Sequence, residues 1–270
     1  MIPILKRGCD IVRAVVTGAN REIGLAIAKV LLGRGDTVFA GVRKVEAESL
    51  KELKGRYGDR LGVMRLNVSS ESSIREFVEG LTDGAVDVLF NNAGVLYKDD
   101  MNNLDYEKVL YTIRVNTLGP LFLTRYLLDN LKKSERPVVV NTDSVLGSIT
   151  TYSETTSYSY SISKAALNMV TRILANDLRR YRIIVISIHP GWVRTDMGGP
   201  AAPVLPEDSA SGIVKVVDSL DIENTGKFYD YTVEKFLGKA FRFLYHLFCL
   251  IVLTGYWFCS IISSGNYIII

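Results

Sequence analysis

Residues 11–33 read IVRAVVTGANREIGLAIAKVLLG, and this stretch decides the fold. It starts as a β-rich run that ends at Thr17-Gly18, and Leu25 to Leu32 then carries the apolar periodicity of a helix up to Gly33. A glycine turn between a strand and a helix presents backbone N–H groups and the positive end of a helix dipole, which can hold a pyrophosphate. The stretch therefore predicts a strand, a phosphate-binding turn and a helix.

The alternation of strands and helices continues along the chain. Further strands are expected at residues 37–41, 61–68, 86–90, 137–141, 183–188 and 226–229, and further helices at 47–53, 70–81, 116–131, 158–178 and 206–220. Strands that alternate with helices form crossover units with parallel strands, and helices then cover both faces of the sheet. We expect an α/β fold with one doubly wound parallel sheet.

Composition narrows the classes of function. A chain of 270 residues can bury one large core, and a net charge of +3 without a basic run interleaved with aromatics argues against nucleic acid as a partner. Cys9, Cys249 and Cys259 are too few and too scattered for a disulfide framework, which indicates a reducing compartment and a cytoplasmic location. His189 and His246 have no ligand-like neighbours, so no metal site is expected.

The two ends of the chain differ. Met1 to Asp10 contain no apolar run of signal-peptide length, whereas Phe243 to Ile270 contain no Asp, Glu, Lys or Arg. Because about 20 apolar residues span a bilayer as a helix, residues 243–263 are a candidate transmembrane anchor. A helix that covers an apolar opening of the fold, or an aberrant coding end, are the alternatives. We divide the chain into a domain at 1–239 and a hydrophobic tail at 240–270.

Residues 160–164 read YSISK and place a phenol and an ammonium four positions apart in a predicted helix. At this spacing Tyr160 and Lys164 leave the same helix face. A nearby ammonium favours the phenolate, so we expect it to lower the pKa of Tyr160 and to suit the phenol to proton transfer. Taken alone, the pattern also fits a solvated lysine beside a half-buried tyrosine.

The order of several motifs resembles the short-chain dehydrogenase/reductase family. The turn Thr17-Gly-Ala-Asn-Arg-Glu-Ile-Gly24 is followed by Asn91-Asn-Ala-Gly94, by Ser144, by the Tyr160 and Lys164 pair, and by Pro190-Gly-Trp-Val-Arg-Thr195. The residues around these motifs resemble the carbonyl-reductase and C-factor-like branch of the family. The resemblance runs from Arg13 to Tyr231 and implies a Rossmann-type domain that works as an NADP-dependent oxidoreductase.

The resemblance also implies a mechanism. In it, Ser144 and Tyr160 hold the oxygen of a ketone or aldehyde while the nicotinamide of NADP(H) delivers a hydride to the carbon. Tyr160 then gives its proton to the oxygen and an alcohol forms. Lys164 lowers the pKa of Tyr160 and binds the nicotinamide ribose, and Asn116 supports a proton path to solvent. The catalytic set is therefore Asn116, Ser144, Tyr160 and Lys164, with a small carbonyl compound as the substrate.

Cofactor contacts follow from the same resemblance. They fall on Gly18, Asn20, Arg21, Ile23, Gly24, Arg43, Asn67, Val68, Asn92, Ala93, Gly94, Tyr160, Lys164, Pro190, Gly191, Val193 and Thr195. Arg43 follows the second strand, where an acid would accept hydrogen bonds from a ribose 2′-hydroxyl, and an arginine there suits a 2′-phosphate instead. Arg21 can approach the same group, so NADP is favoured over NAD. Both arginines also fit an ordinary surface position.

Three positions depart from the family pattern. Glu22 replaces the middle glycine of the turn, Asn67 replaces an aspartate, and Asp143 replaces a small residue before Ser144. Because Glu22 adds bulk and negative charge beside the diphosphate, the alternative function is a dinucleotide-binding sensor or scaffold without turnover. Family members pair through the helices that contain Asn116 and Tyr160, yet single-subunit carbonyl reductases exist, so a homodimer and a monomer both remain open.

Overall fold

The computed structural model describes residues 11–81, 84–150 and 157–232. Three groups of predictions lie outside these ranges: the candidate anchor at 243–263, the three cysteines, and His246. Within the described ranges, no helix combines the length and the apolar character needed to cross a membrane.

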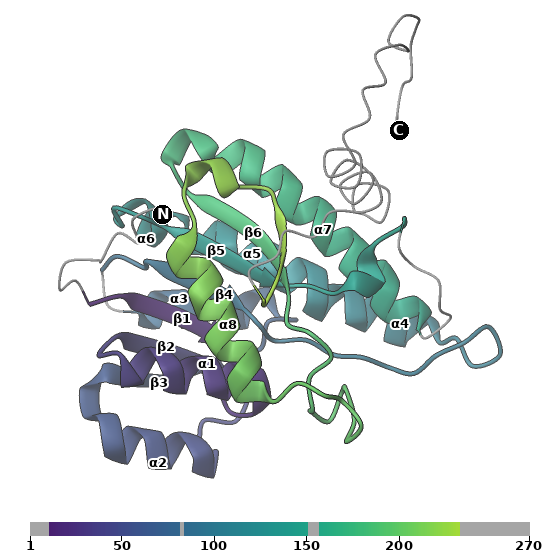
Figure 1. The fold of residues 1–270 in the computed structure, drawn as a ribbon, viewed down its shortest axis with the longest axis horizontal. Helices are drawn as coiled ribbons and strands as arrows, with labels where there is room; N and C mark the ends of the chain where they lie inside the picture. The colour runs from purple at the N-terminus through teal and green to yellow at the C-terminus, as the bar shows by residue number, and fades with distance from the viewer. Residues whose placement is uncertain (1–10, 82–83, 151–156, 233–270) are drawn as a thin grey trace, which may run out of the picture. The chain divides into compact units, whose positions relative to one another are not determined.

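A sheet of seven parallel strands forms the centre of the domain (Figure 1). The strands are β1 Arg13–Thr17, β2 Thr37–Val42, β3 Leu61–Arg65, β4 Val88–Asn91, β5 Val138–Thr142, β6 Ile184–His189 and β7 Phe228–Asp230. Their order across the sheet is β3-β2-β1-β4-β5-β6-β7. Val15 of the central strand pairs with Phe39 on one side and with Leu89 on the other. The doubly wound parallel sheet expected from the sequence is confirmed.

Helices cover both faces of this sheet. They are α1 Glu22–Gly33, α2 Glu48–Tyr57, α3 Glu71–Gly80, α4 Tyr106–Ile113, α5 Gly119–Tyr126, α6 Leu128–Lys132, α7 Tyr158–Leu178 and α8 Pro206–Ser219. The core on one face contains side chains from α1, α2 and α8, and the core on the other contains side chains from α3, α5, α6 and α7. Figure 1 shows α1 and α8 together in front of the sheet.

Alternate strand residues feed the two cores. Val138 and Val140 of β5 lie in the core under α1 and α8, whereas Val139 lies in the core under α7. Successive side chains of a strand point to opposite faces, so a strand that is buried on both faces needs an unbroken apolar run. This is why β1, β4, β5 and β6 read as runs of Val, Ile and Leu rather than as alternating patterns.

The helical region before β5 differs from the prediction. A single helix was expected at 116–131, but helix begins ten residues earlier in α4, continues through a π-helical segment at Arg114–Leu118, and is interrupted at Leu127 between α5 and α6. Asp105 explains the early start, since its carboxylate accepts a hydrogen bond of 2.8 Å from the Lys108 N–H. Asp, a strong N-cap residue, was the sequence signal for this start.

The strand order reverses between β1 and β4. The crossover from β1 runs outward to β2 and β3, and the chain then returns to place β4 on the opposite side of β1. Such a reversal leaves a crevice at the carboxyl ends of the two strands, because the loops there diverge to opposite faces of the sheet. Thr17 and Asn91, the last residues of β1 and β4, lie at this edge.

Candidate active site

A cavity of about 500 Å³ lies at the carboxyl ends of β1 to β6. The residue that directly follows each of these strands lines it, namely Gly18, Arg43, Leu66, Asn92, Asp143 and Pro190. Most of the predicted site residues are brought together in its wall: Gly18, Asn20, Arg21, Ile23, Gly24, Arg43, Asn67, Val68, Asn92, Ala93, Gly94, Tyr160, Lys164, Pro190 and Thr195. Asn116, Ser144, Gly191 and Val193 lie outside that lining.

The glycine turn is held against the loop after β4. The Thr17 hydroxyl accepts hydrogen bonds of 2.9 Å from the N–H groups of Asn92 and Ala93, and the Asn92 amide donates to the Thr17 carbonyl at 3.0 Å. Gly18 has φ +69°, and a Cβ at Gly24 would lie 2.3 Å from the Gly18 carbonyl oxygen. Only glycine fits at position 24, because the start of α1 packs directly on the turn.

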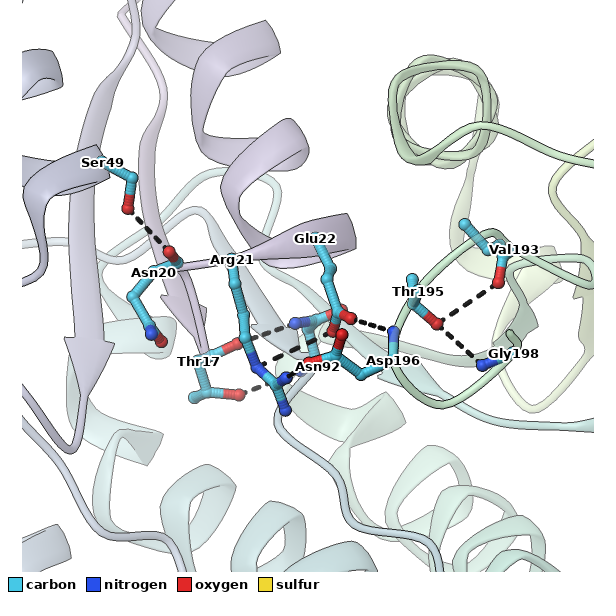
Figure 2. Close-up of polar contacts among 10 residues, drawn as sticks. All are labelled: Thr17, Asn20, Arg21, Glu22, Ser49, Asn92, Val193, Thr195, Asp196 and Gly198. Carbon is cyan, nitrogen blue, oxygen red and sulfur yellow. Dashed lines mark hydrogen bonds and ion pairs between the residues drawn. The ribbon is translucent and has the colours of Figure 1, made fainter. Parts of the chain in front are cut away.

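Glu22 faces the loop after β6 (Figure 2). Its backbone has φ 51°, and its carboxylate accepts a hydrogen bond of 2.5 Å from the Asp196 N–H. The neighbouring Arg21 guanidinium forms an ion pair with the Asp196 carboxylate. The carboxylate of Glu22 is therefore engaged by a backbone N–H of the loop after β6, and Arg21, expected to approach a 2′-phosphate, is paired with Asp196 in this structure.

Arg43 differs from Arg21 in its surroundings. It is exposed at the end of β2, lines the cavity, and has no ion-pair partner among the residues that the structure describes. An unpaired guanidinium with a free planar fork is suited to bind a phosphate. At the next strand end, the Asn67 amide oxygen accepts hydrogen bonds from the N–H and the hydroxyl of Ser69, at 3.2 and 2.8 Å. Asn67 therefore shapes its own turn while lining the cavity.

Tyr160 and Lys164 lie one turn apart on α7 and are both buried, at 8% and 4% exposure. The Lys164 ammonium is 5.5 Å from the centre of the Tyr160 ring and donates a hydrogen bond of 2.7 Å to the Thr142 carbonyl at the end of β5. The Ser157 hydroxyl caps α7 by accepting from the Tyr160 N–H at 3.1 Å. This cap accounts for the start of α7 at Tyr158, two residues before Tyr160.

Ser144 and Asn116, the other two predicted catalytic residues, lie near Tyr160 and Lys164. The Ser144 hydroxyl accepts a hydrogen bond of 3.2 Å from the Leu146 N–H and lies close enough to the Tyr160 phenol to lower the pKa of that phenol. Asn116 lies in the π-helical segment; its amide bonds both backbone groups of Val95 at 2.9 Å and donates to the Ser163 hydroxyl at 3.0 Å. π-Helical segments are often found at functional sites, and this one turns Asn116 inward against α7.

The pKa expected for Tyr160 is wrong for this structure. Burial raises the pKa of the phenol well above its ordinary value, and the Asp143 carboxylate raises it further, while the hydrogen bond with Ser144 lowers it. Burial also lowers the pKa of Lys164, although Asp143 acts in the opposite direction. The sequence pattern showed the ammonium but neither the loss of water around the phenol nor the carboxylate beside it.

Only some residues of the segment after β6 line the cavity. Pro190 and Thr195 line the cavity, but Val193 is buried and forms a β-bridge with Val204. Gly191 has φ +86°, and a Cβ there would lie 2.7 Å from the Tyr231 ring. The positive φ and the packing of Tyr231 therefore both require glycine at this position.

Several residues of the wall were not predicted. They are Glu22, Gly41, Val42, Lys44, Leu66, Val95, Tyr111, Val115, Thr142, Asp143 and Met197. Tyr111 belongs to α4, which the prediction missed, and the Asp105 cap was the signal that would have found it. Among the described residues, no group of three or more His, Cys, Asp or Glu side chains is placed to hold a metal ion.

Comparison with known proteins adds an independent line of evidence. The family model of the short chain dehydrogenases matches residues 12–203, a range that contains the whole cavity wall. The chain is 40% identical to the C-signal of Myxococcus xanthus over 159 residues. This aligned region covers 58% of this chain and 96% of the C-signal.

Two solved structures share the fold closely. The NADPH-bound carbonyl reductase from chicken fatty liver has 30% sequence identity and a TM-score of 0.78, over 83% of this chain and 98% of that one. The carbonyl reductase Sniffer of D. melanogaster has 30% identity and a TM-score of 0.79, over 84% of this chain and 99% of that one.

Proposed function

The chain belongs to the short chain dehydrogenase family of oxidoreductases, and we propose that it reduces the carbonyl group of a ketone or an aldehyde to an alcohol with NADPH as the hydride donor. The observation that carries the proposal is that one cavity contains both the glycine turn after β1 and the buried Tyr160 and Lys164 pair. The structural relatives that are named as carbonyl reductases, one of them NADPH-bound, support the choice of reaction and of cofactor.

The wall of the cavity fits a dinucleotide with a 2′-phosphate. The turn presents no side chain at Gly18 or Gly24, and it lies at the N-terminus of α1, where the helix dipole favours an anion. In this proposal the pyrophosphate binds at the turn, and the exposed Arg43 guanidinium binds the 2′-phosphate. Asn92, Ala93 and the other predicted cofactor contacts of the wall hold the remainder of the dinucleotide.

The side chains at the other end of the cavity hold and protonate the substrate. The nicotinamide, when bound, supplies the hydride that is added to the carbonyl carbon. Ser144 donates a hydrogen bond to the carbonyl oxygen, and Tyr160 transfers the proton of its phenol to that oxygen, so that an alcohol forms. Lys164 donates a hydrogen bond to the Thr142 carbonyl and so fixes the turn of α7 that follows Tyr160. Asn116 donates a hydrogen bond to the hydroxyl of Ser163, the residue before Lys164.

The protonation state of Tyr160 suits this direction of reaction. A general acid must carry its proton at the working pH. Burial and the Asp143 carboxylate raise the pKa of Tyr160, so the phenol is protonated throughout the neutral range. Reduction of a carbonyl uses this protonated form, whereas oxidation of an alcohol needs the phenolate.

Replacing Tyr160 with Phe tests the acid. The Tyr160→Phe protein should lose about 10²- to 10⁴-fold of its carbonyl reduction, since general acid catalysis contributes about that much, while its NADPH affinity stays nearly intact. Turnover is measured with a panel of aldehydes and ketones, and affinity by nicotinamide fluorescence. Tyr158→Phe is the matched control, because Tyr158 is 38% exposed and lies outside the cavity lining. Retained turnover in Tyr160→Phe would remove Tyr160 from the acid role.

A dinucleotide-binding sensor without turnover is the second candidate, and Glu22 is the observation that favours it. Glu22 lines the cavity and begins α1, beside the turn where the pyrophosphate would bind. The same fluorescence titration separates the two functions. NADPH binding without oxidation by any member of the carbonyl panel would support the sensor, and absence of binding would exclude both candidates.

A further inference from the structure

The active site contains a buried carboxylate that the proposed mechanism does not use. Asp143 directly follows β5, is 1% exposed, and lines the cavity with Tyr160 and Lys164. Acidic side chains are almost never fully buried unless they are paired. The family pattern has a small residue at this position, so the carboxylate is a property of this chain.

Two hydrogen bonds to Asp143 favour its ionised form and so oppose the effect of burial. One oxygen accepts from the Ser144 N–H at 2.8 Å, and the other accepts from the Ser187 hydroxyl at 3.0 Å. Both oxygens therefore act as acceptors, which is the behaviour of an ionised carboxylate. The first of these bonds also fixes the backbone of Ser144, the neighbour of the Tyr160 phenol.

A buried row of polar side chains leads to this carboxylate. The Asn91 side-chain amide donates to the Asn141 side-chain oxygen Oδ1 at 2.9 Å, and the Asn141 amide donates to the Thr171 hydroxyl at 2.8 Å. The Ser187 hydroxyl is within donating distance of both the Thr171 hydroxyl, at 2.9 Å, and the Asp143 carboxylate, at 3.0 Å. Hydrogen bonds in such a network strengthen one another.

The charged groups around Asp143 come from α7. Lys164 and Tyr160 interact with it electrostatically, and β6 contributes the uncharged Ser187, while His189 at the end of β6 interacts with Asp230. Burial raises the pKa of Asp143 to about 6, and Lys164 opposes this rise. Near neutral pH the carboxylate therefore carries its charge beside a buried ammonium and a buried phenol.

We infer that Asp143 is a positioning residue whose buried carboxylate, held by Ser144 and Ser187 next to the Thr142 carbonyl that binds Lys164, confines alcohol oxidation to alkaline pH while carbonyl reduction proceeds across the neutral range. The inference rests on the proposed function of Tyr160 as the proton donor. In reduction the phenol proton goes to the carbonyl oxygen. In oxidation the phenolate takes the proton of the alcohol hydroxyl, and a negative charge beside it disfavours that phenolate.

Asp143→Asn removes the charge and keeps the shape. The Asn oxygen still accepts from the Ser144 N–H, and its NH₂ donates to Ser187, whose proton then turns to Thr171. The pH midpoint of kcat/KM for alcohol oxidation should fall by about one pH unit or more, which is the usual effect of removing one nearby charge. Asp143→Ser, with the small residue of the family pattern, is the second variant and should shift the midpoint in the same direction.

Asp99→Asn is the matched control. Asp99 is a second buried carboxylate, 7% exposed, that accepts from the Ser159 N–H at 3.3 Å at the start of α7 and does not line the cavity. Its replacement should leave the pH midpoint of oxidation unchanged. An equal shift in Asp99→Asn would overturn the inference, because the effect would then reflect any loss of negative charge near α7.

A measurement without turnover separates this inference from the proposed function. The Tyr160 ring is followed by NMR with isotope-labelled tyrosine, and its signal is identified by its loss in Tyr160→Phe. The phenol should titrate at a lower pH in Asp143→Asn than in the parent protein. An unchanged titration beside normal carbonyl reduction would refute the role of Asp143 and leave the function intact. A shifted titration in a protein without turnover would do the reverse.

Thermal unfolding across pH gives a further check with a defined sign. The pKa of Asp143 is raised on folding from its ordinary value of about 4 to about 6. The folded protein therefore holds a proton that the unfolded chain has lost in this window, so its stability falls as the pH rises through it. Asp143→Asn lacks this titration, and its stability relative to the parent should rise over the same window. Parallel pH profiles of the two proteins would contradict the burial of an ionised Asp143.

Discussion

Replacing Gly24 with Ala should destabilise the domain, although alanine is the better helix former. Gly24 lies in the first turn of α1, and an added Cβ would meet the Gly18 carbonyl oxygen at 2.3 Å and the Asn92 amide nitrogen at 2.6 Å. Overpacking costs about 1–3 kcal/mol, and the upper end applies because a backbone oxygen cannot rotate away. The higher helix propensity of alanine stabilises the folded state by at most about 1 kcal/mol. The net loss is about 2 kcal/mol.

Gly33→Ala is the control in the same helix. Gly33 ends α1, is exposed, and has no heavy atom within 4 Å of an added Cβ. Only the propensity gain remains there, so stability should rise by up to about 1 kcal/mol. For a domain of this size, 1 kcal/mol corresponds to about 2–4 °C in Tm. We expect Gly24→Ala to lower Tm by about 4–8 °C and Gly33→Ala to leave it unchanged or slightly higher.

The assay is thermal unfolding of the two variants and the parent protein, followed by NADPH titration of each folded variant. Gly24→Ala should also weaken NADPH binding, because the clash moves the turn at which the pyrophosphate binds in the proposed function. Equal changes in Tm for the two variants would refute the reasoning, since both have the same propensity term and differ only in the packing of α1 on the turn.

Two further predictions concern the cofactor end of the cavity. Arg43→Ala should weaken NADPH binding by about 10- to 100-fold, because a charge-assisted hydrogen bond contributes about 1.5–3 kcal/mol. The same substitution should leave NADH binding unchanged. Equal losses of affinity for both nucleotides in a fluorescence titration would show that Arg43 does not bind the 2′-phosphate. Glu22→Gly should strengthen NADPH binding by about 3- to 10-fold, because it removes a negative charge beside the diphosphate. Glu22→Gln removes the charge but keeps the size of the side chain, and so separates the two effects. Unchanged NADPH affinity in both variants would mean that the hydrogen bond from the Asp196 N–H holds the carboxylate away from the phosphates.

The doubly wound parallel sheet and the family were within reach of the sequence. Apolar runs such as Val138–Val140 are local patterns, and a strand buried on both faces must show them wherever the sheet is parallel. The four-residue spacing of Tyr160 and Lys164 likewise depends only on helix geometry, and the helix at 158–178 has the predicted bounds. The family resemblance drawn from the motifs is confirmed by the match over residues 12–203.

Only the tertiary structure decided the electrostatics of the site. The ion pair of Arg21 with Asp196 joins residues 175 positions apart, and the proximity of Asp143 to Tyr160 arises because the end of β5 meets α7 at one edge of the sheet. Burial and long-range pairing depend on which loops converge, and no periodicity in the sequence records that convergence. For this reason the sequence located the phenol and the ammonium, whereas the folded chain determined the direction in which the pKa of the phenol moved.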